Sequence, residues 1–205
     1  AYNKIVNLSD KKKSLGIIAA SAGNHAQGVA LACKKLKIKC NIVMPVTAPE
    51  NKLNNVKRLG AKVTLHGENL AHALVKASKM SKQNKYTFVH PFDDPFTIAG
   101  QGTVGKEILD DEIDYDVIFV PVGGGGLLAG ISAWVKQHKK KIKIIGVEVN
   151  DSACLTEALK SNKRVMLERV GLFADGVAVS QVGKNNLDAV SYKHLRAHET
   201  VVYLV

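Results

Sequence analysis

The feature that most constrains the fold is a repeated alternation of short apolar runs with longer amphipathic runs. The short runs are rich in Val and Ile, turn residues bound most of them, and they predict strands: Leu15–Ala20, Cys40–Met44, Lys62–Leu65, Thr87–Val89, Val117–Pro121 and Ile142–Val149. The longer runs carry helical spacing: His25–Lys35, Pro49–Leu59, Asn69–Gln83, Phe96–Leu109, Leu127–Gln137 and Ser152–Lys160. This alternation predicts an α/β fold with a parallel sheet flanked by helices.

Ligands of such sheets bind beyond the carboxyl ends of the strands, where strand-to-helix turns converge. Two turns of this kind stand out, at residues 20–28 and 120–130. Helix-start signals support the helices, such as Thr47 ahead of Pro49.

Composition excludes several classes of protein. No apolar run approaches the ~18 residues of a membrane span, and the chain has no signal-peptide pattern at its start. Cys33, Cys40 and Cys154 are odd in number and irregularly spaced, which indicates core thiols in a reducing, cytoplasmic compartment rather than a disulfide framework or a zinc site.

The net charge of +11 leaves open a basic module that binds nucleic acid. However, the lysine runs lie where helices end and strands start, and no aromatic residue is interleaved with them. This pattern favours a solvated surface, so we expect neither a nucleic-acid nor a membrane partner.

Four consecutive glycines, Gly123–Gly126, follow a predicted strand and open a predicted helix. Glycine is a poor packing residue that costs about 0.5–1 kcal/mol relative to alanine in regular structure. Here it permits a ligand to approach closely and several N–H groups to converge on one point. With a helix N-terminus behind it, the turn predicts a phosphate cradle.

The cradle does not indicate which phosphate-bearing ligand binds there. Residues 124–129 also satisfy the dinucleotide pattern GxGxxA, and Glu148 ends the next strand at about the distance of a ribose-binding acid. A dinucleotide-dependent oxidoreductase that uses nicotinamide or flavin is therefore an alternative.

The turn at residues 20–28 contains Ser21, Gly23, Asn24 and His25. Ser21 could cap the helix, Gly23 could make a tight turn, and the N–H groups would suit a carboxylate. Asn24 offers a donor and an acceptor to a phenolate-like oxygen, whereas a lone His25 is more typical of a structural hydrogen bond. An amino-acid substrate beside a phosphate-bearing cofactor requires this second pocket, and a dinucleotide does not.

The two turns, in this order and about a hundred residues apart, resemble those of fold-type II pyridoxal-phosphate (PLP) enzymes, the tryptophan synthase β-like group. Residues 66–69 (HGEN) and 90–103 (HPFDDPFTIAGQGT) resemble threonine dehydratases in particular. Residues 151–155 (DSACL) and 170–179 (VGLFADGVAV) resemble the biosynthetic, isoleucine-pathway branch. The resemblance covers roughly residues 1–183.

The resemblance implies deamination of L-threonine to 2-oxobutanoate and ammonia. Asn24 would hydrogen-bond the 3′-oxygen of the cofactor. Its phosphate would bind backbone N–H groups of Gly123, Gly124, Gly125, Gly126 and Leu127. The substrate carboxylate would bind Ser21, Gly23, Asn24 and His25.

Two departures from related serine racemases bear on the chemistry. Ala22 replaces a second serine that acts as acid and base in those enzymes, which favours elimination over racemisation. Cys154 stands where they place an aspartate of a cation site, so we predict no metal.

The resemblance also implies that the sequence is truncated. The lysine that carries the cofactor would lie four residues before Ala1, so we expect no catalytic residue within the chain and little activity from it alone. Residues 190–200 resemble a translated sequencing adapter, and we expect 190–205 to be non-native.

We therefore expect a two-domain arrangement of the fold-type II class. A small α/β domain would span residues 14–94, and residues 1–13 and 95–189 would form part of a large domain, with the cofactor between them. We expect the full-length protein to be a homo-oligomer, a dimer or a tetramer. Within the same group, a catabolic serine/threonine dehydratase or a serine racemase-like enzyme is the alternative.

Overall fold

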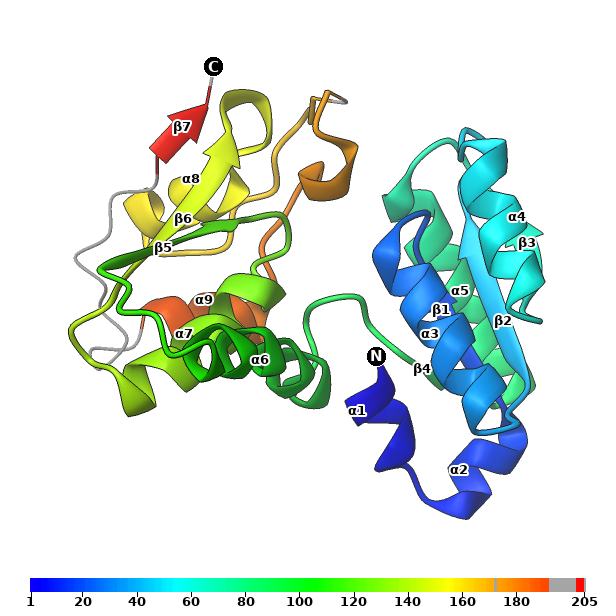
Figure 1. Ribbon diagram of the computed structural model, residues 1–205. Coiled ribbons are helices and arrows are strands. Elements are labelled where there is room, and N and C mark those ends of the chain that lie inside the picture. The colour runs from blue at the N-terminus through cyan, green and yellow to red at the C-terminus, as the bar shows by residue number, and fades with distance from the viewer. Residues whose placement is uncertain (172, 192–201, 205) are drawn as a thin grey trace. The chain divides into compact units, whose positions relative to one another are not determined.

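The computed structural model describes residues 1–171, 173–191 and 202–204. The chain divides into two compact units, Ala1–Pro91 and Phe92–Val205, each of which is described by itself (Figure 1). Residues 1–13 group with the first unit through α1, Tyr2–Val6, whose Ile5 is buried in that unit's core. The predicted domain limits stay a prediction.

The first unit is built on a four-stranded parallel sheet of order β3-β2-β1-β4. Its strands are β1 (Ile17–Ala20), β2 (Cys40–Met44), β3 (Lys62–Leu65) and β4 (Thr87–Phe88). Its helices are α1, α2 (Asp10–Leu15), α3 (Asn24–Lys35), α4 (Glu50–Arg58) and α5 (Leu70–Asn84). The chain moves to opposite sides of β1 to form β2 and β4, so the turn after β1 lies at the switch point of the sheet, where ligands of such folds bind.

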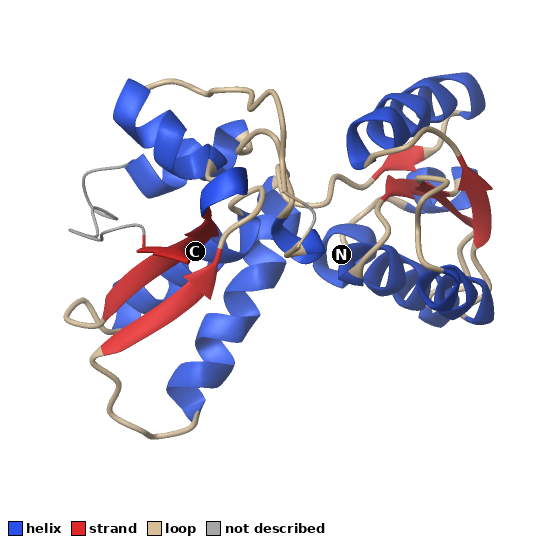
Figure 2. Ribbon diagram, turned by 90° about the horizontal axis from the view of Figure 1, so that it is seen from above, coloured by secondary structure: helices blue, strands red, loops and turns tan. Residues whose placement is uncertain are grey.

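Alternate residues of β1 face opposite sides of this sheet, and helices cover both (Figure 2). Ile17 and Ala19 pack in the cluster that holds Val29 of α3. Ile18 and Ala20 pack in a second cluster with Ala73 and Ala77 of α5. Because helices cover both faces of the sheet, the sequence of β1 is an unbroken apolar run, as is typical of buried parallel strands.

The second unit holds a three-stranded parallel sheet of order β5-β6-β7. Its strands are β5 (Val117–Pro121), β6 (Lys143–Val149) and β7 (Val202–Leu204). Its helices are α6 (Pro95–Asp110), α7 (Gly126–His138), α8 (Cys154–Ser161) and α9 (Lys184–Ser191), with short 3-10 turns η1 (Asn150–Ser152) and η2 (Asp175–Val177).

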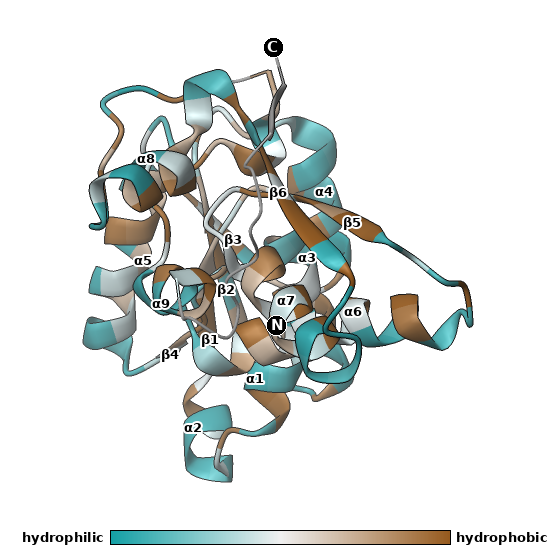
Figure 3. Cartoon of the chain, turned by 90° about the vertical axis from the view of Figure 1, so that its left-hand side faces the viewer, coloured by the Kyte–Doolittle hydropathy of each residue, from teal (hydrophilic) through white to brown (hydrophobic). Residues whose placement is uncertain are grey.

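Apolar residues cover one face of this sheet, with Ile118, Val120 and Ile144 buried against α7 and α8. On the other face Phe119 is 63% exposed. Figure 3 shows β5 and β6 as apolar strands.

Helices α6 and α7 pack closely because glycines lie at their contact. A Cβ atom at Gly130 would lie 2.4 Å from the carbonyl oxygen of Ile98 and 2.7 Å from the nitrogen of Gly102. A Cβ atom at Gly102 would lie 3.1 Å from the oxygen of Gly130. The backbones therefore touch, and this contact fixes α7, whose first turn follows the four glycines.

The predicted α/β class and its parallel sheets are confirmed, and all twelve predicted strands and helices are present within a few residues of their limits. Two local predictions are wrong. Leu15 ends α2 instead of starting β1, because Gly16 at φ +97° separates them. Thr47 does not cap α4, because its hydroxyl donates to the carbonyl of Glu68 and Pro49 occupies the cap position.

Residues 190 and 191 lie in α9, and 202–204 pair with β6. The rest of the segment predicted to be non-native, 192–201 and 205, lies outside the described residues.

We expect Gly130→Ala to destabilise the second unit by about 1–3 kcal/mol, because the new methyl group meets backbone atoms that cannot turn away. Urea unfolding followed by the fluorescence of Trp134, the single tryptophan and a residue of α7, measures the change. Gly176→Ala is the matched control, since a Cβ atom there meets nothing within 4 Å. Equal effects of the two substitutions would contradict the packing argument.

Candidate functional site

The four glycines form a loop between β5 and α7, and residues 123–128 are here called the glycine loop. The N–H of Val122 still donates to the carbonyl of Val147 across the sheet, at 2.8 Å. Gly125 then adopts φ +87° and is the N-cap of α7, with no side chain to cap the helix. The left-handed conformation explains the need for glycine at that position.

None of the backbone N–H groups of the glycine loop has a hydrogen-bond acceptor within the described ranges of the chain. The first bond of the helix is the one from the N–H of Ala129 to the carbonyl of Gly125, at 2.9 Å. Gly124, Gly125, Gly126 and Leu128 are buried. Because buried N–H groups in native proteins are nearly always paired, this row of donors fits a bound anion.

The direction in which side chains would project from the loop is occupied by protein. A Cβ atom at Gly124 would lie 2.3 Å from the ring of Phe92, and one at Gly126 would lie 3.0 Å from the Phe92 carbonyl oxygen. A Cβ atom at Gly123 would lie 3.1 Å from Cα of Val177. The glycine pattern predicts close approach of a ligand, and the structure shows that packing against protein requires these glycines as well.

Two helix starts hold carbonyl groups of the loop. The carbonyl oxygen of Gly124 accepts from the N–H of Gly183 at 3.0 Å and from Nδ2 of Asn186 at 2.7 Å. The thiol of Cys154 donates to the carbonyl oxygen of Gly123, with 3.5 Å between sulfur and oxygen. Burial raises the pKa of Cys154 to about 12, so this thiol keeps its proton at neutral pH.

The segment after Pro91 organises the surroundings of the glycine loop. Asp93 accepts from the N–H groups of Lys184 and Asn185, each at 2.9 Å, at the start of α9. Asp94 caps α6 by accepting from the N–H groups of Phe96 and Thr97, each at 3.0 Å. Two adjacent carboxylates thus fix two helices, and Phe92 beside them packs on the loop.

The turn after β1, in the first unit, carries the second set of predicted site residues. Helix α3 starts at Asn24, and the N–H groups of residues 24–26 have no acceptor in the described part of the chain. A Cβ atom at Gly23 would meet nothing within 4 Å, and Asn24 is exposed. Open space beside unpaired helix-start N–H groups fits a carboxylate.

Ser21 does not cap α3, contrary to the sequence prediction. The N-cap is Gly23, and the Ser21 hydroxyl accepts from the N–H of Gly23 at 3.1 Å. The Ser21 N–H pairs with the carbonyl of Val43 at 3.1 Å, so Ser21 still belongs to the sheet. Its hydroxyl shapes the turn three residues before the helix begins.

His25 makes the structural hydrogen bond that its sequence context indicated. Its Nε2 lies 3.1 Å from the carbonyl oxygen of Val89, and because a carbonyl only accepts, Nε2 carries the proton of the neutral ring. Burial lowers the pKa of His25 from 6.5 to about 4, so the ring is neutral at pH 7. It is therefore not a cation for the substrate carboxylate.

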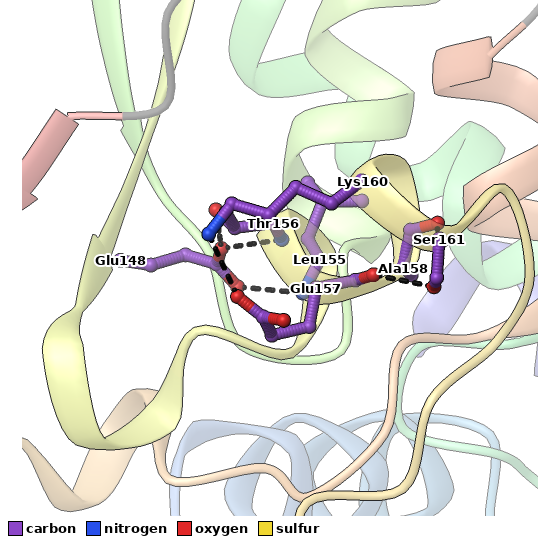
Figure 4. A network of polar contacts seen from close by, with 7 residues as sticks. All are labelled: Glu148, Leu155, Thr156, Glu157, Ala158, Lys160 and Ser161. Atoms are coloured by element: carbon purple, nitrogen blue, oxygen red, sulfur yellow. Dashed lines mark hydrogen bonds and ion pairs between the residues drawn. The ribbon is translucent and has the colours of Figure 1, made fainter.

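Glu148 is fully buried and caps α8, as Figure 4 shows. Its two oxygens accept from the N–H groups of Leu155 and Thr156, each at 2.9 Å, and from the Thr156 hydroxyl at 2.7 Å. Burial raises the pKa of this carboxyl, against the opposing effect of the three hydrogen bonds. A carboxylate enclosed in this way does not reach a ribose, so the dinucleotide role suggested for Glu148 is wrong.

The other residues that the structure describes add no second centre. Among the described residues, no group of three His, Cys, Asp or Glu side chains could hold a metal ion. Cys33 and Cys154 are buried and Cys40 is partly buried, in agreement with the prediction of core thiols. No helix in the described ranges is long and apolar enough to cross a membrane.

Comparison with known families gives the origin of these turns. Residues 1–205 match the family described as pyridoxal-phosphate dependent enzyme. The chain belongs to this family. The resemblance inferred from the sequence is thereby confirmed, PLP is the cofactor of the family, and a dinucleotide-dependent oxidoreductase is ruled out as its class.

Several relatives of this PLP-dependent chain are threonine dehydratases. It is 52% identical over 183 residues to the biosynthetic L-threonine dehydratase IlvA of Pasteurella multocida, which is 89% of this chain and 36% of the relative. Processed threonine deaminase isoform 2 from Solanum lycopersicum superimposes with a TM-score of 0.91 at 43% identity, covering 98% of this chain and 58% of that one.

Maize serine racemase gives a TM-score of 0.90 at 28% identity, covering 99% of this chain and 60% of that one. The chain spans about a third of the length of the curated relatives that it matches. The predicted site residues lie in both units: Ser21, Gly23, Asn24 and His25 in the first, and the glycine loop in the second. Their roles toward a ligand stay predictions.

Sequence reasoning missed Phe92, Asp93, Gly183 and Asn186, which enclose the glycine loop. The motif at residues 90–103 indicates only a family resemblance, and residues 183–186 match no pattern that predicts a role. Consecutive aspartates ahead of a proline are a helix-cap signal that could have indicated Asp94. No local pattern indicated the contact between residues 92–93 and 184–186, which lie about ninety positions apart.

We expect Glu148→Gln to destabilise the second unit by about 1–3 kcal/mol, because the new amide group would face N–H donors that now bond to a carboxylate. Urea unfolding followed by Trp134 fluorescence checks this. Glu157→Gln is the control, since the exposed ion pair of Glu157 with Lys160 is worth less than about 1 kcal/mol. A loss that is no larger for Glu148 than for Glu157 would show that the capping role is misassigned.

We expect the ring of His25 to resist protonation down to pH ~5. A base with a lowered pKa in the folded state contributes stability above its unfolded value of 6.5, and this contribution is lost as the pH falls toward 4. The shift corresponds to roughly 3 kcal/mol. Proton NMR of the ring checks the titration, with His25→Gln to assign the signal. A midpoint near 6.5 would contradict the burial of the imidazole.

Proposed function

We propose that the protein of which this chain forms part deaminates L-threonine to 2-oxobutanoate and ammonia with PLP as cofactor. The observation that carries the proposal is the row of unpaired N–H groups in the glycine loop, in a chain 52% identical to a threonine dehydratase. The biosynthetic relatives favour a place at the start of isoleucine synthesis.

The glycine loop would hold the phosphate of the cofactor. Backbone N–H groups of Gly123, Gly124, Gly125, Gly126 and Leu127 supply the donors, and the N-terminus of α7 adds the positive end of its dipole. The site needs no charged side chain for this, which agrees with the apolar surroundings of Phe92 and Val182.

The turn after β1 would bind the substrate carboxylate and the ring of the cofactor. N–H groups at the start of α3 are unpaired, and Gly23 leaves space beside them. The exposed amide of Asn24 would bond the 3′-oxygen of the cofactor. The hydroxyl of Ser21 and the neutral ring of His25 would keep this turn in place.

When bound, PLP supplies an electron sink for charge that develops beside the amino group of the substrate. The chain contributes orientation, so that the hydroxyl on the β-carbon can leave as the α-proton is removed. We assign no residue of this chain to the removal of that proton. The resemblance places the lysine responsible ahead of Ala1, which stays a prediction.

Ala22 argues against racemisation as the main reaction. A racemase needs a proton donor on the face opposite to the one from which the proton leaves, and a methyl group supplies none. Ala22 packs against the core of the first unit, with no ionisable group in its own side chain. The likeness to maize serine racemase at 28% identity therefore supports the shared fold rather than a shared reaction.

A reducing compartment suits three free cysteines, two of them buried, so we place the protein in the cytoplasm. We also propose a homo-oligomer for the full-length protein. Gel filtration of that protein with light scattering would test its oligomeric state.

We expect Asn24→Ala in the full-length protein to lower kcat/KM for L-threonine by about 10–100-fold, because it removes the hydrogen bond that orients the cofactor ring. Production of 2-oxobutanoate and the visible spectrum of the cofactor measure the effect. Stability should not change, because Asn24 is exposed. Asn55→Ala, an exposed asparagine of α4, is the control. Unmodified enzyme that forms no 2-oxobutanoate from threonine would refute the proposed function.

A further inference from the structure

The side chain of Asn186 is buried and bonds only through its nitrogen. Its Nδ2 donates to the carbonyl oxygens of Gly124, at 2.7 Å, and Phe92, at 3.2 Å. Its Oδ1 is the one buried side-chain oxygen or nitrogen in the described part of the chain that has no hydrogen-bond partner. Burying an amide oxygen without a hydrogen-bond partner costs free energy, so the presence of this amide requires an explanation through its donor, Nδ2.

The carbonyl of Gly124 is therefore fixed by two donors from the start of α9, the N–H of Gly183 and the amide of Asn186. No described residue follows a cis peptide bond, and in a trans peptide the carbonyl and the following N–H point in opposite directions. Fixing the oxygen of Gly124 thus directs the N–H of Gly125 away from α9. The bond from Cys154 to the carbonyl of Gly123 acts in the same way on the N–H of Gly124.

The fit around Asn186 is close enough to define one orientation of that peptide. A Cβ atom on Gly125 would lie 3.1 Å from Cβ of Asn186, and a Cβ atom on Gly183 would lie 2.5 Å from its Nδ2. Gly125 has φ +87°, a conformation that glycine leaves easily for others, so a constraint from outside the loop is needed to hold it.

We propose that Asn186 is a positioning residue for phosphate binding: by holding the Gly124 carbonyl it turns the N–H of Gly125 toward the cofactor phosphate. This rests on the proposed role of the glycine loop. Asn186 itself does not contact the phosphate in this proposal. Its contribution is to orient the N–H of Gly125 in advance. Without it, this donor would have to be ordered when the ligand binds, and that cost would lower the affinity for phosphate.

The experiment measures binding of pyridoxine 5′-phosphate to the full-length protein by calorimetry. This probe has the phosphate but no aldehyde, so it cannot react with the many surface amines. We expect Asn186→Leu, of similar size but without a donor, to weaken binding about tenfold or more. Asn185→Ala is the matched control, because the neighbouring amide donates to Asp93 and not to the loop, and binding should stay within twofold.

Asn186→Asp separates positioning from general damage. At low pH its protonated carboxyl can donate to the Gly124 carbonyl, whereas at high pH its carboxylate faces carbonyl oxygens. We expect the ratio of its dissociation constant to that of the unmodified protein to rise between pH 5.5 and pH 8. Comparing both proteins at each pH cancels the titration of the ligand.

Unmodified affinity in Asn186→Leu, or an equal loss in Asn185→Ala, would overturn the positioning role. If the leucine variant does not fold, the aspartate variant decides, and a ratio independent of pH would overturn the proposal. Failure of the unmodified protein to bind the probe would instead remove the proposed phosphate site, a result distinguishable from the others.

Discussion

The conformation of the glycine loop depends on how the carbonyl oxygen of Gly124 is held. Its two donors come from the start of α9, which is itself fixed by Asp93. Phe92, one residue earlier, fills the space in front of Gly124 and Gly126. A loop of four glycines has little preference of its own, so its conformation comes from these contacts. The unpaired N–H groups of the loop are a consequence, because the protein that touches the loop presents donors to its carbonyl oxygens and packing to its Cα atoms, and no acceptors to its N–H groups among the described residues.

Contacts from outside the element fix the helices as well. Helix α7 has no side-chain cap, and what fixes it is backbone contact with α6 through Gly102 and Gly130. Helix α6 is capped by Asp94, the neighbour of the residue that fixes α9. Residues 92–94 therefore connect the loop, α6 and α9 over three consecutive positions. These contacts give the segment a structural reason to be part of a recognisable motif.

Much of the fold could be predicted, because periodicity and turn residues are local properties: the strand at 17–20 is a continuous apolar run, and the glycine loop follows a strand directly. Caps were harder. Ser21 and Thr47 are good capping residues by type, yet Ser21 bonds within its turn and Thr47 bonds to Glu68. Asn186 could not be predicted at all, since its partners Phe92 and Gly124 lie 94 and 62 positions away. Contacts of that span depend on the assembled sheet rather than on sequence pattern.

Glu148 shows how burial decides between two chemistries that share a sequence pattern. An acid at the end of a strand after GxGxxA suits a ribose, provided that its oxygens are free. Here both oxygens accept hydrogen bonds from N–H groups at the start of α8. The first residue of that helix, Cys154, donates its thiol proton to a carbonyl oxygen of the glycine loop. Leaving buried N–H groups unpaired costs about 1–3 kcal/mol each, so the loop is stable only if packing elsewhere offsets that cost. An anion that pairs with these N–H groups should therefore stabilise the fold as it binds. A phosphate without an attached ribose fits this role, because it does not require Glu148 to leave the start of α8.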